Sequence, residues 1–136
     1  QLIENPSFVA EYTGLKNLEM LACIKNKIEI EDIRHAMEQV GLDPDDKRTY
    51  KKYSLGMKQK LGIAAAFMEK PDIIILDEPI NALDEVGAKQ VHKILEEQKK
   101  RGALIIIACH DKEELEMLSD EIIEIYEGRI VAGEKE

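Results

Sequence analysis

The sequence has few aromatic residues and a minority of positive charge. It contains no tryptophan, and aromatic residues make up 4% of its 136 positions. Proteins that hold single-stranded nucleic acid usually stack its bases on aromatic rings. There are 19 lysines and arginines against 28 aspartates and glutamates, for a net charge of -9. Because affinity for a phosphate backbone comes mostly from lysine and arginine, the composition disfavours direct nucleic-acid binding.

Cysteines and long apolar runs are also scarce. Cys23 and Cys109 stand far apart in apolar stretches, which predicts two buried, reduced thiols of a cytosolic protein. No apolar run approaches the length needed to cross a bilayer, and the opening residues QLIENPSF lack the basic segment of a signal peptide. The remaining composition is typical of one globular domain. Since no methionine opens the chain, we expect a piece of a longer protein.

The first half of the sequence has the periodicity of helices. Residues 14–26 and 28–41 repeat apolar residues at helical spacing, with Thr13 as an N-cap and Gly41 as a C-terminal glycine. A third helix is predicted over residues 54–69, before a proline. The side chains expected to face inward are Leu15, Leu18, Leu21, Ala22, Ile30, Ile33, Met37, Val40, Leu61, Ala64, Ala65 and Met68.

The second half alternates strands with helices. Short apolar runs at 73–76 and 103–109 predict strands that are buried on both faces, and an amphipathic helix at 85–102 joins them. This order forms a βαβ unit, so the two strands should be parallel. A short helix at 111–119 and a strand pair at 121–134 follow. The sequence therefore predicts an α/β fold.

Polar residues follow both predicted parallel strands. Asp77 and Glu78 end the first strand, whereas Cys109, His110 and Asp111 end the second. The carboxyl ends of parallel strands lie at one edge of a sheet, where open α/β folds bind ligands. We therefore expect two carboxylates and an imidazole to converge there.

The chemistry of these groups suits a metal-bound phosphate. A carboxylate such as Asp77 is a hard oxygen ligand for Mg²⁺. Glu78 could orient or deprotonate a water, and His110 could donate to a phosphoryl oxygen. The alternative is that Asp77 and Glu78 merely begin a loop, with Asp77 accepting nearby backbone amides, and that His110 is an ordinary core or turn histidine.

Four motifs in order resemble those of the ATP-binding cassette (ABC) ATPases. Residues 71–85, PDIIILDEPINALDE, are similar to the Walker B strand, catalytic glutamate and D-loop. The signature motif is matched by KYSLGMKQK at 52–60, and the switch-histidine loop by IIIACHD at 105–111. The strand pair at 123–134 resembles the one that follows that loop. Residues 2–21 are similar to the segment after the Q-loop, especially in bacterial multidrug and antimicrobial-peptide exporters.

The resemblance implies a P-loop NTPase-like fold, in which a parallel sheet core carries a helical subdomain and the N-terminal part is missing. Residues 1–70 would hold a Q-loop remnant and the helical signature subdomain. Residues 71–136 would form the Walker B, D-loop and H-loop part of a RecA-like core.

The resemblance also assigns roles to residues on the second half. Asp77 would hold Mg²⁺ through water, and Glu78 would be the general base or water-orienting carboxylate. His110 would contact the γ-phosphate of ATP. Asp84 would belong to the loop that crosses a dimer interface.

The N-terminal half would supply the remaining contacts. Ser54 and Gly56 would meet the γ-phosphate of ATP held by the opposite subunit, although Ser54 could also be an ordinary N-cap. Leu55 and Met57 depart from the usual Leu-Ser-Gly-Gly-Gln, so the Leu55 side chain must point away from phosphate. Glu4 stands where the Q-loop glutamine is expected.

The implied function is the ATP-hydrolysing subunit of a transporter, with export as the expected direction. Its partners would be a second such subunit in a head-to-tail homodimer and a transmembrane permease. It would lie in the cytoplasm, peripheral at the inner face of the cell membrane. Two alternatives stay open: a non-hydrolysing module that uses the cassette shape as a scaffold, and a cytosolic ABC ATPase that acts on nucleic acid or ribosomes.

One expected motif is absent from the sequence. No G-x-x-x-x-G-K-[ST] pattern occurs among the 136 residues. Such a loop supplies the backbone amides and the lysine that hold the β- and γ-phosphates of ATP. We therefore expect this chain alone to bind ATP weakly and to hydrolyse none measurably.

Overall fold

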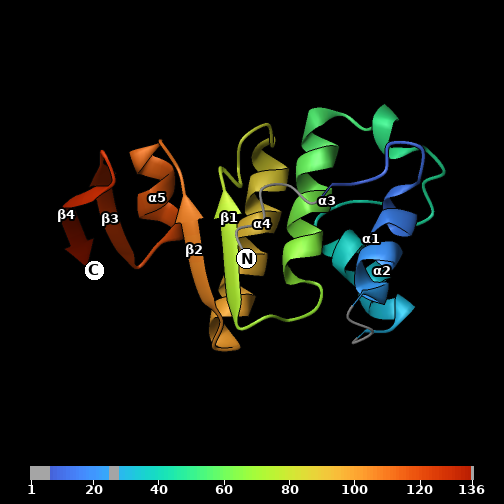
Figure 1. The fold of residues 1–136 in the computed structure, drawn as a ribbon, viewed down its shortest axis with the longest axis horizontal. Helices are drawn as coiled ribbons and strands as arrows, with labels where there is room; N and C mark the ends of the chain where they lie inside the picture. The colour runs from blue at the N-terminus through green and yellow to red at the C-terminus, as the bar shows by residue number, and fades with distance from the viewer. Residues whose placement is uncertain (1–6, 25–27, 136) are drawn as a thin grey trace.

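The computed structural model describes residues 7–24 and 28–135, whose arrangement is shown in Figure 1. In chain order the elements are α1 (Gly14–Cys23), α2 (Ile30–Gln39), the 3-10 turn η1 (Tyr50–Lys52), α3 (Leu55–Phe67), β1 (Ile73–Asp77), α4 (Glu85–Lys100), β2 (Leu104–Ala108), α5 (Lys112–Leu118), β3 (Glu121–Tyr126) and β4 (Arg129–Lys135). The helices α1 to α3 lie at one end of the molecule and the β3–β4 hairpin at the other, with β1 and β2 between them. No helix in the two described ranges is long and apolar enough to cross a membrane.

Short-range hydrogen bonds fix the ends of the first two helices. The Thr13 hydroxyl accepts the backbone N–H of Lys16 at 3.2 Å, which confirms Thr13 as the N-cap of α1. Glu29 and Asp32 form a reciprocal capping box at the start of α2. Gly41 follows α2 with a φ of 82°, a left-handed conformation that glycine adopts at little cost.

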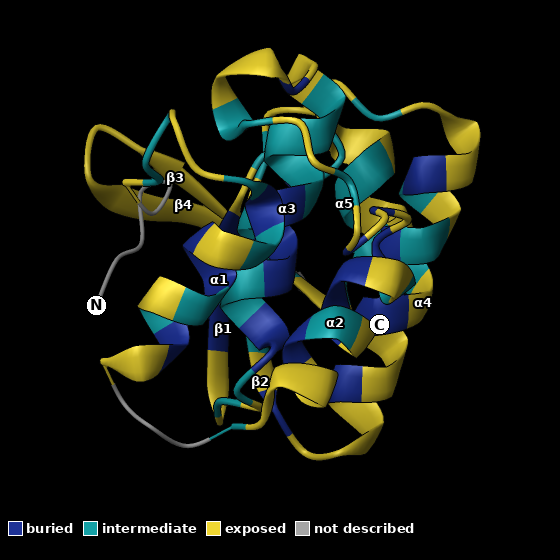
Figure 2. Cartoon of the chain, turned by 90° about the vertical axis from the view of Figure 1, so that its right-hand side faces the viewer, coloured by how far each residue is buried: buried dark blue, intermediate teal, exposed yellow. Residues whose placement is uncertain are grey.

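The buried side chains gather among the helices α1 to α4 and β1, whereas the β3–β4 hairpin is exposed (Figure 2). Eight of the expected inward residues are buried: Leu18, Ala22, Ile33, Met37, Val40, Leu61, Ala64 and Met68. Leu15, Leu21 and Ala65 are partly buried against this core. The prediction for Ile30 is wrong, because it opens α2 and remains exposed one turn before the buried residues begin. Since α3 packs on both α2 and β1, the core crosses residue 70, and the expected division there stays a prediction.

The strands β1 and β2 form the predicted parallel pair, with α4 as the connection between them. Ile74 of β1 is buried with residues of α3 and α4 in the core. On the opposite face of the pair, Ile73 is 56% exposed, Leu104 57% and Ile106 48%. The prediction that both strands are buried on both faces is therefore wrong. The reason is that, within the described residues, helices cover only one face.

Asn17 ties the segment before α1 to the helix. Its side chain is 4% exposed. Its Oδ1 accepts the N–H of Val9 at 2.7 Å, and its Nδ2 donates to the carbonyls of Val9 and Thr13, both at 3.0 Å. A buried amide with these partners is stabilising only while all of them are present.

Replacing Asn17 should therefore destabilise the fold. We expect Asn17→Ala to lower the free energy of unfolding by about 1–3 kcal/mol, because the part-buried N–H and carbonyl of Val9 lose their partner. Urea unfolding measures this change, and the exposed Lys16→Ala on the same helix is the control. Equal unfolding midpoints for the two variants would contradict the assigned role of Asn17.

Candidate functional site

The carboxyl ends of β1 and β2 lie side by side at one edge of the sheet. Asp77, the last residue of β1, is paired in register with Ala108, the last residue of β2. The backbone N–H of Glu78 donates to the carbonyl of Ala108 at 2.8 Å, which extends the pairing by one step. The groups that follow the two strands therefore begin from adjacent positions, as expected for parallel neighbours.

Glu78 and His110 are in direct contact at this edge. The carboxylate Oε1 of Glu78 accepts the backbone N–H of His110 at 3.1 Å. The imidazole Nε2 of His110 lies 3.7 Å from the same oxygen, a distance that makes an ion pair only when the imidazole is protonated. The His110 side chain is fully exposed, and that of Glu78 is 31% exposed. Both groups therefore remain accessible to a ligand while they touch each other.

Asp77 precedes Glu78 in the chain, and its carboxylate has no partner in the described part of the structure. It is exposed, and within residues 7–24 and 28–135 its side chain forms none of the hydrogen bonds or ion pairs of the structure. The alternative in which Asp77 accepts backbone amides of its own loop therefore finds no support. Free carboxylate oxygens at a strand end are the hard ligands that Mg²⁺ takes, often through water. The free carboxylate of Asp77 is thus a ligand of the type that fits this ion.

The backbone of Glu78 is strained. Its φ of 46° lies in the left-handed region, which for a residue other than glycine costs about 1–3 kcal/mol and persists only where neighbours enforce it. The carbonyl of Glu78 accepts the Nε2 of Gln59 at 3.0 Å and the N–H of Asn81 at 3.1 Å. No sequence pattern indicates a role for Gln59, because a contact across 19 positions leaves no local signal.

The beginning of α3 lies against the loop that precedes α4. Ser54 caps α3, and its Oγ accepts the N–H of Met57 at 3.1 Å, so the ordinary cap role is present. A side chain at Gly56 would place its Cβ 2.9 Å from the carbonyl oxygen of Ala82. Leu55 is 70% exposed, as expected for a side chain that points outward. Contact of Ser54 or Gly56 with a phosphate stays a prediction.

Of the other two expected site residues, Asp84 lies within the described residues and Glu4 does not. Asp84 is the N-cap of α4, and its Oδ1 accepts the N–H of Gly87 at 2.7 Å. It is exposed, on the loop that contacts Gly56. Its expected place in a dimer interface stays a prediction. Glu4 lies outside the described residues.

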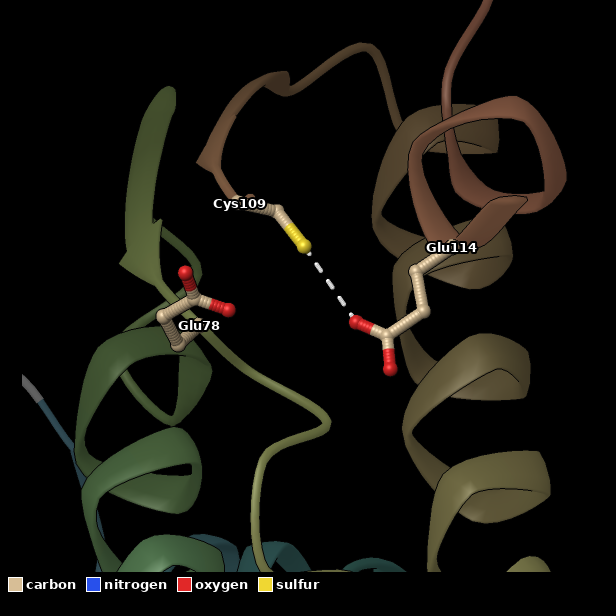
Figure 3. Close-up of side chains that lie close together, drawn as sticks. All are labelled: Glu78, Cys109 and Glu114. Carbon is tan, nitrogen blue, oxygen red and sulfur yellow. Dashed lines mark hydrogen bonds between the residues drawn. The ribbon is translucent and has the colours of Figure 1, made fainter. Parts of the chain in front are cut away.

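Cys109 adds a thiol between the two carboxylates of Glu78 and Glu114 (Figure 3). Its thiol donates to Glu114 Oε2 at 3.2 Å, and the N–H of Asp111 donates to its sulfur at 3.3 Å. Burial is the main cause that raises the Cys109 pKa to about 11, and the neighbouring carboxylates add to it. The thiol is therefore neutral at physiological pH.

Both cysteines are free, but the prediction that both are buried is wrong: Cys23 is exposed and Cys109 half-buried.

The raised pKa predicts selective labelling of the two thiols. At pH 8, iodoacetamide should alkylate Cys23 well before Cys109, because the thiolate is the reacting form and Cys109 holds its proton up to a pKa of about 11. Peptide mass spectrometry over a time course measures both sites. Labelling of Cys109 should accelerate as the pH rises towards 11, and rapid labelling at pH 8 would refute the assignment.

Comparison with known proteins places these features in a wider group. The family model described as ABC transporter matches residues 2–81. The ABC transporter ATP-binding protein YybJ of Bacillus subtilis is 46% identical over 98% of this chain and 62% of its own length. The bacitracin transport ATP-binding protein BcrA of Enterococcus faecalis is 40% identical over 96% of this chain and 42% of its own. The lantibiotic transport ATP-binding protein SrtF of Streptococcus pyogenes is 39% identical over 96% and 56%.

Solved structures agree with this similarity. An ATP-binding subunit of an ABC transporter superposes on this chain with a TM-score of 0.86 at 28% identity. The superposition covers 98% of this chain and 57% of the length of that subunit. The dimeric ABC transporter cassette MJ0796 superposes with a TM-score of 0.85 at 20% identity, which supports the fold. This superposition covers 98% of this chain and 61% of the cassette. This chain thus spans about 42% to 62% of the length of the relatives and structures described.

Proposed function

The chain belongs to the ABC transporter family, and on that premise we propose that it forms part of an ATP-hydrolysing subunit that powers export across a membrane. The relatives described above are transport ATP-binding proteins, two of them named for bacitracin and lantibiotics. We propose a substrate of that kind for the transporter that this chain serves. The chain itself would act on ATP at the cytoplasmic face of the membrane.

One observation carries the proposal: the contact between Glu78 and His110 beside the free carboxylate of Asp77. Glu78 can accept a proton, His110 can donate to an anion and Asp77 can bind a cation. All three lie at the carboxyl ends of two parallel strands. Ligands of open α/β sheets bind at this edge. This arrangement favours an enzyme over a scaffold module without turnover.

In the proposed reaction, a water attacks the γ-phosphorus of ATP while the bond from that phosphorus to the β,γ-bridging oxygen breaks and ADP leaves. The Glu78 carboxylate accepts a proton from the attacking water, or orients that water. The exposed His110 imidazole donates a hydrogen bond to a γ-phosphate oxygen. Asp77 would hold Mg²⁺ through water, and the bound ion would supply positive charge against the phosphates. The contact of 3.1 Å between the Glu78 carboxylate and the His110 N–H keeps the base beside the phosphate contact.

A second copy of this subunit and a transmembrane permease would complete the proposed transporter. We propose that Ser54 and the amides near Gly56, at the positive end of α3, face the γ-phosphate of ATP held by the partner in a head-to-tail homodimer. Asp84 would lie at the same interface, and Glu4 would fill the Q-loop position. The helical part before residue 70 would dock on the transmembrane permease.

Hydrolysis also needs a phosphate-holding loop from outside these 136 residues, because the sequence contains no G-x-x-x-x-G-K-[ST]. We expect the 136-residue chain alone to give no steady release of phosphate from ATP. A coupled phosphate assay with and without Mg²⁺ measures this. A sustained, Mg²⁺-dependent rate from the isolated chain would contradict the proposed division of the site.

The central test is a change of the proposed base that keeps its size and removes its charge. In the complete ATP-binding protein, Glu78→Gln should lower kcat by about a hundredfold to ten-thousandfold, since that is the range attributed to general acid–base groups. ATP binding, measured by calorimetry, should persist. Glu124→Gln, an exposed carboxylate on β3, is the matched control and should leave kcat unchanged. Equal rates for Glu78→Gln and the wild type would refute the role of Glu78.

A further inference from the structure

The direction of the Glu78 carboxylate depends on an unusual backbone conformation. The residue follows β1 directly and precedes Pro79, yet its φ is 46°. A residue before proline is restricted sterically and favours extended conformations. An extended Glu78 would continue the line of β1 and send its side chain in another direction. Something must hold the left-handed turn in place.

Three hydrogen bonds restrain this turn, and one of them comes from a distant helix. The N–H of Glu78 donates to Ala108 at 2.8 Å, and its carbonyl accepts the N–H of Asn81 at 3.1 Å; both bonds are formed by backbone groups. The third is the bond from Gln59 Nε2 to the same carbonyl, at 3.0 Å in a part-buried setting. Gln59 is therefore the side chain of α3 that holds the backbone of Glu78.

We propose that Gln59 is a positioning residue for Glu78, a statement that rests on the proposed ATPase function of this site. By holding the carbonyl, Gln59 keeps the carboxylate against the His110 N–H, where Oε1 accepts at 3.1 Å. Gln59 contacts neither Asp77 nor the His110 imidazole through any hydrogen bond within the described residues. It acts on the reaction only through the conformation of Glu78.

The position of Gln59 on α3 gives this bond a second consequence. The same helix begins at Ser54 and carries Gly56, the residues proposed to meet the partner's ATP. Gln59 stands five positions after Ser54, near the same end of α3, so a rigid helix moves the three residues together. Displacement of α3 relative to β1 would stretch the Gln59 bond and free the Glu78 backbone. The contact of α3 with the partner's ATP and the direction of the Glu78 carboxylate are thus coupled through the Gln59 side chain.

Substitutions at Gln59 separate this role from general structural support. In the complete protein, Gln59→Leu removes the donor with little change of size. We expect kcat to fall by about tenfold to a hundredfold, the range given for a misplaced catalytic group, with KM for ATP changed less than about twofold. Gln59→Lys keeps an N–H donor on a long side chain and should recover most of kcat. Gln39→Leu is the control, because Gln39 donates to the exposed Glu97, its one side-chain partner in the described part of the chain.

Amide hydrogen exchange provides a readout that does not need ATP hydrolysis. The N–H of His110 is protected by the Glu78 carboxylate, so it should exchange faster in Gln59→Leu than in the wild type or Gln39→Leu. Gln59→Met is a second donor-free variant if Gln59→Leu folds poorly. Unchanged kcat and unchanged His110 exchange in a folded donor-free variant overturn the proposal. A wild type without ATPase activity overturns the proposed function instead, while the exchange comparison still decides the role of Gln59.

Discussion

The left-handed turn at Glu78 is the constraint on which the site depends. It ends β1 with the Glu78 N–H bonded to Ala108 of the neighbouring strand. Strand pairing therefore sets where the turn begins, and the buried Pro79 limits how the chain can leave it. An acidic residue in this conformation stores strain that the surrounding fold must offset. The benefit is a carboxylate aimed at His110 rather than along the strand.

The helical half of the chain supports this edge from the other side. The helix α3 packs on β1 and α2, and it carries both the capped turn at Ser54 and the amide of Gln59. The contact of Gly56 with the Ala82 carbonyl leaves no room for a side chain between α3 and the loop before α4. Two segments that are distant in sequence are thereby held together close to the strand ends. These contacts join the helical half of the chain to the ends of the strands.

Local patterns in the sequence predicted most of the fold and the convergence of Glu78 with His110, because caps, periodicity and the βαβ rule depend on neighbouring residues. They failed where the outcome depends on distant elements. Apolar strands read as buried on both faces, yet Leu104 is exposed because helices cover one face of the described pair. Cys23 lies in an apolar run but ends α1 in solvent. Gln59 and Asn17 form their hydrogen bonds through tertiary geometry that no spacing reveals.

The most direct test of this account is a crystal structure of the complete protein with Mg²⁺ and a non-hydrolysable ATP analogue. We expect Glu78 to keep a positive φ, with its carboxylate and the His110 imidazole facing the same γ-phosphate. An extended Glu78, with its carboxylate on the opposite side of the sheet from His110, would contradict it.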